Sequence, residues 1–316
     1  MSQAAILIFL AVATLALSTS AVYAANNGIF TLFQFVRDVL DHIKIFLFTP
    51  EDTFNVSAIN SAIDEAGPRV FVEHKSFFSP SIGTEKNYTV LLPSGYYENS
   101  QRRYPVLYLL HGLWGNENTW IVRGRIVQIY QRLLAENKIK EVIIAMPDGD
   151  NSAYENDCSG SVAFSCGNYG DYIIKDFIRE IDSKYRTMAD RNHRAISGLS
   201  LGARGAIRLS FLHPDKFVFT GAQSGRYFYL LQEMADEQWT RLKNANITIY
   251  FDHSSNDVIP GYFSSSRELN KILTEKGITH EYQELNFPIQ DSHGWPFWQQ
   301  QVVIVLEKAC KVICLS

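Results

Sequence analysis

Residues 198–202, Gly-Leu-Ser-Leu-Gly, place a serine hydroxyl between two glycines, the residue pattern of a nucleophile presented at a sharp turn. The segment before it, 194–197, is typical of a short buried strand, and the apolar spacing over 201–212 indicates an amphipathic helix. A strand, a tight turn and a helix would lift the hydroxyl above the sheet. They would also aim the N–H of Leu201, the first helical residue, at an oxygen that acquires negative charge. The local context therefore predicts Ser200 as a catalytic nucleophile.

A serine nucleophile needs a base to remove its proton and an acid to orient that base. In a chain that alternates strands and helices, these groups follow the serine in the order acid, then histidine. We predict His293 as the base, because it lies in a polar loop between a predicted strand and the last predicted helix. We predict Asp257 as the acid, since it lies deep in the loop that follows the strand ending at residue 251. Asp252, at the start of that loop, is the first alternative, and Asp291 is the second.

Stabilising an oxyanion takes a second N–H besides that of Leu201. An apolar run over 105–110 ends in His-Gly-Leu-Trp, a turn that can direct backbone N–H groups toward the serine. We expect the N–H of Leu113 to be this second donor. His111 precedes the serine in the chain, and we expect it to hold the turn by hydrogen bonds rather than to act as the base.

Aromatic residues in loops near these groups are candidates for substrate contacts. They are Trp114, Tyr154, Tyr169 and Trp295. The loop over 148–171 follows a predicted strand at the edge where ligands bind in open α/β sheets, and it also carries Phe164. A disulfide between Cys158 and Cys166 would fix this loop and its aromatic side chains as a wall for the substrate.

The other cysteines and the acidic residues leave alternatives open. Cys310 and Cys314 could pair with each other or remain as packed thiols. The acidic loop over 148–157 could hold a calcium ion, although a solvated loop is the simpler interpretation. No histidine or cysteine has the spacing of a zinc finger, so we predict no metal site.

The first 68 residues differ in pattern from the rest of the chain. Residues 1–24 contain an apolar run followed by small residues at a cleavage point after Ala24, which predicts an export signal and a secreted protein. The run is shorter than the roughly 20 residues that span a bilayer. In the segment 25–68, residues 26–49 form a predicted amphipathic helix, whose mixed charges favour packing on the protein over contact with a membrane. We expect the catalytic domain over 69–316.

The composition is that of a folded domain with a sizeable core: 316 residues are 46% hydrophobic and 20% charged. The net charge of −4, with scattered Lys and Arg, argues against a nucleic-acid partner. Predicted strands alternate with predicted helices, which indicates an α/β fold with a mostly parallel sheet and helices on both faces. The expected strands cover 70–75, 87–92, 105–110, 141–146, 194–197, 217–222, 246–251 and 279–285. The expected helices cover 126–136, 172–185, 201–212, 264–276 and 296–311.

Residues 109–112 with Trp120, the pentapeptide 198–202, Asp257 and the segment 293–298 (His-Gly-Trp-Pro-Phe-Trp) together resemble the esterase D-like family of α/β-hydrolases. That family includes feruloyl and acetyl-xylan esterases, S-formylglutathione hydrolases, enterobactin esterases and mycolyltransferases. The resemblance covers about residues 70–306. It implies the α/β-hydrolase fold and a covalent acyl-enzyme on serine formed without a cofactor, and it leaves the substrate open.

The sequence thus predicts a secreted serine carboxylesterase that acts on a small-molecule or carbohydrate ester. An acyltransferase with the same triad is the first alternative, because an acyl-enzyme can pass its acyl group to a sugar hydroxyl instead of water. The alternative of another class is a catalytically silent hydrolase-fold module that binds carbohydrate. The presence of all three triad residue types disfavours that module. Export also argues against a glutathione thioester, which is a cytosolic substrate.

Overall fold

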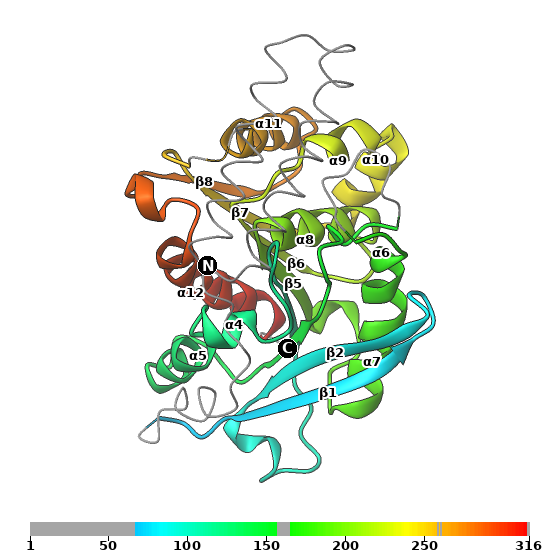
Figure 1. Ribbon diagram of the computed structural model, residues 1–316, viewed down its shortest axis with the longest axis vertical. Coiled ribbons are helices and arrows are strands. Elements are labelled where there is room, and N and C mark those ends of the chain that lie inside the picture. The colour runs from blue at the N-terminus through cyan, green and yellow to red at the C-terminus, as the bar shows by residue number, and fades with distance from the viewer. Residues whose placement is uncertain (1–66, 157–164, 258, 260, 315–316) are drawn as a thin grey trace, which may run out of the picture. The chain divides into compact units, whose positions relative to one another are not determined.

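An open sheet of eight strands sets up one edge at which several loops meet. The computed structural model describes residues 67–156, 165–257, 259 and 261–314. Within them the strands lie in the order β1-β2-β4-β3-β5-β6-β7-β8 (Figure 1). The pairs β1–β2 and β2–β4 are antiparallel, and the other neighbours are parallel. The strands are β1 (Phe71–Ser79), β2 (Thr84–Leu92), β3 (Val106–Leu110), β4 (Ile143–Pro147), β5 (Arg194–Leu199), β6 (Phe219–Gln223), β7 (Thr248–Ser254) and β8 (Glu281–Leu285).

Helices cover both faces of the sheet, and an apolar core lies under each layer (Figure 1). One face carries α6 (Tyr169–Asp171), a π-helical stretch (Tyr172–Phe177), α7 (Ile178–Lys184), α8 (Leu201–Leu212), α9 (Phe228–Glu233), α10 (Asp236–Ala245) and α11 (Tyr262–Glu275). The other face carries α4 (Thr119–Val122), α5 (Ile126–Ala135) and α12 (Trp295–Ile313). Short 3₁₀ turns lie at Ser94–Tyr96, Arg191–His193 and Ile289–Asp291. The central strands are buried on both sides, which explains their continuous apolar runs.

The predicted α/β fold is confirmed, and the structure adds three helices that the sequence did not suggest. All eight expected strands and all five expected helices are present in the described residues, with shifted ends. The unexpected helices are α4, α9 and α10. In α10, only Trp239 and Leu242 are buried, so the helix has too few apolar positions to give a periodic signal.

Several predictions fall outside the described residues. They concern the export signal over 1–24, the amphipathic helix over 26–49, Cys158 and Phe164. The pairing of Cys158 with Cys166 therefore stays a prediction. In the part of the chain that the structure describes, no helix has both the length and the apolar character needed to cross a membrane.

A close backbone contact joins the turn between β5 and α8 to the end of β3. A Cβ atom on Gly202 would lie 2.5 Å from the carbonyl oxygen of His111 and 2.6 Å from that of Leu110. A Cβ atom on Gly198 would lie 2.5 Å from the carbonyl carbon of Gly202. These distances exclude any side chain, so the two glycines allow α8 to begin directly beside the turn that follows β3.

We expect Gly202→Ala to lower the free energy of unfolding by about 2 kcal/mol, because the added methyl group must displace the end of β3 or the first turn of α8. Urea denaturation measures the change. Gly294→Ala is the matched control, since the nearest atom to its Cβ would be the carbonyl oxygen of Asp291, at 3.5 Å. Equal losses in the two variants would contradict the close contact at Gly202.

Candidate active site

Ser200 lies in the turn after β5 and caps the N-terminus of α8. Its backbone has φ 50° and ψ −114°, a conformation that residues with a side chain rarely adopt. The Ser200 N–H donates to the carbonyl oxygen of Gln223, at the end of β6, over 2.8 Å. This bond and the flanking glycines hold the strained turn in place. The serine hydroxyl is thereby presented at the carboxyl edge of the sheet.

Ser200, His293 and Asp257 form a hydrogen-bonded chain at this edge. Nε2 of His293 lies 3.0 Å from Oγ of Ser200, and Nδ1 lies 2.7 Å from Oδ2 of Asp257. The serine follows β5, the aspartate follows β7 and the histidine follows β8, all of them parallel strands. When Nδ1–H donates to the carboxylate, Nε2 is left to accept the serine proton. The structure thus brings together the three residues that the sequence predicted as a triad.

Each oxygen of the Asp257 carboxylate has a polar contact, and the side chain is fully buried. Oδ1 accepts the N–H of Ile259 over 2.8 Å. Oδ2 lies 2.7 Å from Nδ1 of His293 and 2.8 Å from Nε2 of His253. Burial alone would raise the pKa of Asp257, but the charge of His293 and the hydrogen bonds from both histidines outweigh burial and hold that pKa below its usual range. Asp257 is therefore ionised beside the base.

His253 is a second imidazole on the same carboxylate, and sequence analysis gave it no role. Its side chain is fully buried in β7, and Nδ1 lies 3.0 Å from Oγ of Ser266 on α11. Burial lowers the pKa of His253, although the Asp257 carboxylate acts in the opposite direction. A neutral imidazole with its proton on Nε2 would donate to Asp257 and accept from Ser266. Because a buried strand histidine is usually structural, nothing in the sequence distinguished this one.

Aromatic rings surround the imidazole of His293. The ring centroids of Tyr262 and Trp298 lie 5.1 Å and 5.2 Å from that of His293, both in edge-to-face geometry. The Tyr262 hydroxyl also interacts with Ser200. Burial raises the pKa of Tyr262, whereas the guanidinium of Arg226 and the hydrogen bond to Ser200 act to lower it. These contacts restrict the histidine ring to the orientation that reaches the serine.

The turn after β3 lies against the serine and contains one predicted oxyanion donor. Nδ1 of His111 lies 2.8 Å from the carbonyl oxygen of Gly112, and the N–H of Gly149 donates to Nε2 over 2.9 Å. The hydrogen-bonding role predicted for His111 is confirmed. A Cβ atom on Gly112 would lie 3.4 Å from the serine Cβ, so Leu113 follows a residue in contact with the nucleophile. Leu201 is the first residue of α8, where an N–H has no partner within the helix.

The structure corrects the placement of two of the predicted substrate contacts. Tyr154 is 0% exposed and donates its hydroxyl to the carbonyl oxygen of His111, and Tyr169 is 5% exposed and donates to Asp150. Both rings pack in the hydrophobic core beneath the loop, because burying an aromatic ring against apolar side chains is favourable. They support the loop and do not form a wall facing the substrate.

The two predicted tryptophan contacts are placed differently. Trp114, next to Leu113, is 49% exposed, and its backbone N–H donates to Oδ1 of Asn151 over 2.7 Å. Trp295 is half-buried, with its ring edge-on to those of Trp120 and Trp298. Trp114 therefore remains a candidate for direct contact with a substrate, and Trp295 supports the ring that borders His293.

The acidic loop after β4 contacts a buried lysine. Nζ of Lys86 lies 3.1 Å from Oδ2 of Asp148 and 2.7 Å from Oδ2 of Asp150, so these carboxylates already have a cationic partner. Across the described residues, no group of three or more His, Cys, Asp or Glu side chains is arranged to hold a metal ion.

Cys310 and Cys314, at the C-terminal end of α12, are buried thiols that are not disulfide-bonded.

Asp252, the alternative acid, is placed away from the histidine. Its neighbour in β7, His253, faces Asp257, so Asp252 points to the other face of the sheet. The side chain is completely buried, and the hydroxyl of Tyr250, two residues earlier in β7, is the side-chain donor that acts on it. Burial raises the pKa of Asp252 well above its ordinary value and outweighs the opposing hydrogen bond from Tyr250, so burial favours the neutral form of this group.

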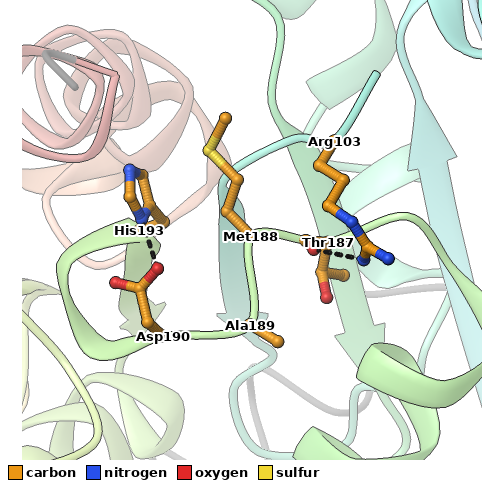
Figure 2. Close-up of a pocket in the computed structure, with 6 residues that line it drawn as sticks. All are labelled: Arg103, Thr187, Met188, Ala189, Asp190 and His193. Carbon is orange, nitrogen blue, oxygen red and sulfur yellow. Dashed lines mark hydrogen bonds and ion pairs between the residues drawn. The ribbon is translucent and has the colours of Figure 1, made fainter. Parts of the chain in front are cut away.

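A surface depression of about 570 Å³ lies at the opposite edge of the sheet, before β5 (Figure 2). It is lined by Arg103, Thr187, Met188, Ala189, Asp190 and His193. The polar groups there are already paired: Nδ1 of His193 lies 2.7 Å from Asp190, and Arg103 donates to the carbonyl oxygen of Thr187 over 3.0 Å. This depression has no nucleophile and is separated from Ser200 by the length of β5.

A family model named Esterase matches residues 79–308, most of the described chain. The chain belongs to the Esterase family. The family is described as putative esterases, and the predicted resemblance is confirmed. The endo-1,4-beta-xylanase/feruloyl esterase of Xylanibacter ruminicola is 33% identical over 52% of this chain and 23% of its own length. The acetyl esterase of Caldicellulosiruptor saccharolyticus is 25% identical over 65% of this chain and 83% of its own length.

A solved structure of a ferulic acid esterase has the same fold, with a TM-score of 0.68. It is 23% identical, and the match covers 78% of this chain and 99% of the other. The match to the xylanase/feruloyl esterase spans only about a quarter of that relative's length. The comparisons therefore establish the family and the fold. They do not identify the substrate, which has to be inferred from the chemistry of the site.

We expect Asp252→Asn to stabilise the protein increasingly as the pH rises. The unfolded carboxyl ionises above about pH 4, whereas the folded one stays protonated, so folding takes up a proton and stability falls with increasing pH. The variant lacks this loss. The free energy of unfolding of the variant minus that of the wild type, measured in urea, should therefore be larger at pH 8 than at pH 5. Asp236→Asn, which removes a 97% exposed carboxylate, is the control. A difference independent of pH would contradict a neutral Asp252.

Proposed function

We propose that this protein is a serine carboxylesterase that uses Ser200, His293 and Asp257 as its triad. The observation that carries the proposal is the continuous contact from Oγ of Ser200 through both nitrogens of His293 to the buried Asp257 carboxylate. Membership of the Esterase family supports the reaction class. The strained turn presents the serine hydroxyl, and the turn after β3 and the start of α8 carry the proposed oxyanion donors, Leu113 and Leu201.

The reaction follows from this geometry. His293 removes the proton of Ser200 through Nε2, and the serine oxygen attacks the ester carbonyl. The N–H groups of Leu113 and Leu201 stabilise the resulting oxyanion. Asp257 keeps the proton on Nδ1 and stabilises the imidazolium, which then protonates the leaving alcohol. Water, activated by the same histidine, hydrolyses the acyl-enzyme.

The proposed substrates are acyl esters of carbohydrates, with Trp114 beside the oxyanion turn as a surface on which a sugar or an aromatic acyl group can stack. Two relatives are named for feruloyl and acetyl ester hydrolysis, which supports this class. We also propose that the protein is exported, on the basis of the N-terminal sequence over 1–24.

The test of the function is hydrolysis of 4-nitrophenyl acetate with stoichiometric inactivation by a fluorophosphonate. We expect Ser200→Ala to abolish labelling and Asp257→Asn to lower kcat by about 10⁴-fold, because asparagine cannot enforce the tautomer or stabilise the imidazolium. Asp252→Asn is the matched control and should retain activity. Turnover that survives Ser200→Ala would contradict the proposal, and a release of 4-nitrophenol that depends on an added sugar would indicate an acyltransferase.

We expect His253→Leu to lower kcat tenfold or more with little change in KM, because Asp257 loses a hydrogen bond to its charged form. The pH profile of kcat should also differ from that of the wild type, because His253 contacts the carboxylate that orients His293. The groups that act on His253 are Asp257, His293, Glu284 and the Ser266 hydroxyl. His253→Gln keeps an N–H donor and should restore most of the rate. A loss of thermal stability with an unchanged kcat and pH profile would show that His253 is only structural.

A further inference from the structure

Arg226 brings a positive charge to the edge that carries the triad. It lies in the loop after β6, three positions beyond Gln223, whose carbonyl oxygen accepts the Ser200 N–H. Its guanidinium packs against Gly261, where Cζ, Nε and Nη2 each lie 3.7 Å from the position of a Cβ atom. The next residue, Tyr262, packs edge-on against the catalytic histidine. Arg226 is therefore adjacent to the wall of the active site.

Arg226 has a donor without an acceptor. Its Nε is buried and has no hydrogen-bond partner in the part of the chain that the structure describes. The carboxylates of Glu155 and Asp257 are already paired, because Glu155 contacts Arg204, and Asp257 contacts two histidines. A buried N–H of a charged group is costly when it has no acceptor. An acceptor supplied by a ligand beside the triad would satisfy this guanidinium.

The loop that carries this arginine is fixed on the histidine side of the triad. Oγ of Ser224 accepts the indole N–H of Trp298 over 3.3 Å, and the Trp298 ring borders His293. At the other end of the loop, the N–H of Tyr227 donates to Oγ of Ser265 on α11. In ester cleavage the histidine gives its proton to the departing alcohol, so the alcohol half of the ester occupies this side.

We propose that Arg226 binds a carboxylate on the alcohol half of the substrate, so that the enzyme prefers esters of acidic alcohols, such as acylated acidic sugars, to neutral esters. This inference rests on the proposed esterase function and names its substrate class. A guanidinium presents parallel N–H groups that match the two oxygens of a carboxylate. The pair would form in a partly buried site, where salt screens charges weakly.

The test compares 4-acetoxybenzoate with its methyl ester, two acetate esters that differ by one charge on the alcohol half. We expect the ratio of their kcat/KM values to fall roughly tenfold or more in Arg226→Gln, because a hydrogen bond to a charged group is lost. The rate on the neutral ester should change little, and Arg226→Lys should keep part of the preference. Arg241→Gln is the matched control, since it removes an exposed arginine near His213, at the far end of α8 from the serine.

Equal ratios in the wild type and Arg226→Gln would overturn the proposal. A second pair of esters, mono-4-nitrophenyl adipate and its methyl ester, carries the charge on the acyl half. A preference that depends on Arg226 for this pair alone would contradict the assignment to the alcohol. If the wild type hydrolysed neither neutral ester, the esterase function itself would fail, and this inference with it.

Discussion

The contact between the first turn of α8 and the end of β3 is the constraint on which the active site depends. Gly202 lets the helix begin where a side chain would collide with the carbonyl oxygen of His111. Next to this contact, Ser200 has a positive φ, Leu201 begins the helix, and Gly112, the residue before Leu113, lies against the serine Cβ. Because β5, β7 and β8 are parallel, the acid and the base reach the same edge. The triad thus depends on the close approach of α8 to β3 for its serine and on the loops after β7 and β8 for its acid and base.

Burial and pairing set the charge of each group at this edge. Asp252 and Asp257 are both buried carboxyl groups, five positions apart in the chain. Burial raises the pKa of Asp252 despite a hydrogen bond from Tyr250, whereas Asp257 contacts two imidazoles and a backbone N–H, which hold its pKa low. His253 contacts the ionised Asp257 carboxylate. The guanidinium of Arg226 is positively charged, and no carboxylate of the described residues pairs with it. A substrate that carries a negative charge would balance this arrangement.

The sequence predicted what depends on local pattern and on chain order. The apolar runs gave the strands, and the glycine-flanked Ser200 with a later aspartate and histidine gave the residues that the structure brings together. The pairing of His253 with Asp257 was not predicted, because it depends on how the chain turns after β7, and the residue types alone do not show that His253 faces the carboxylate. The aromatic residues of the loop after β4 were assigned to the surface, but Tyr154 and Tyr169 are buried because the core beneath the loop accepts them. Hydrophobicity alone does not say which face of a loop a ring will occupy.

The central claim is that an acyl group passes through the hydroxyl of Ser200. The most direct measurement is mass spectrometry of peptides from an acid-quenched reaction with 4-nitrophenyl acetate, taken during the first turnover. We expect an acetyl group on the peptide that contains Ser200, and none on the corresponding peptide of Ser200→Ala. Release of 4-nitrophenol without an acetyl adduct on this peptide, or with the adduct on another residue, would contradict it.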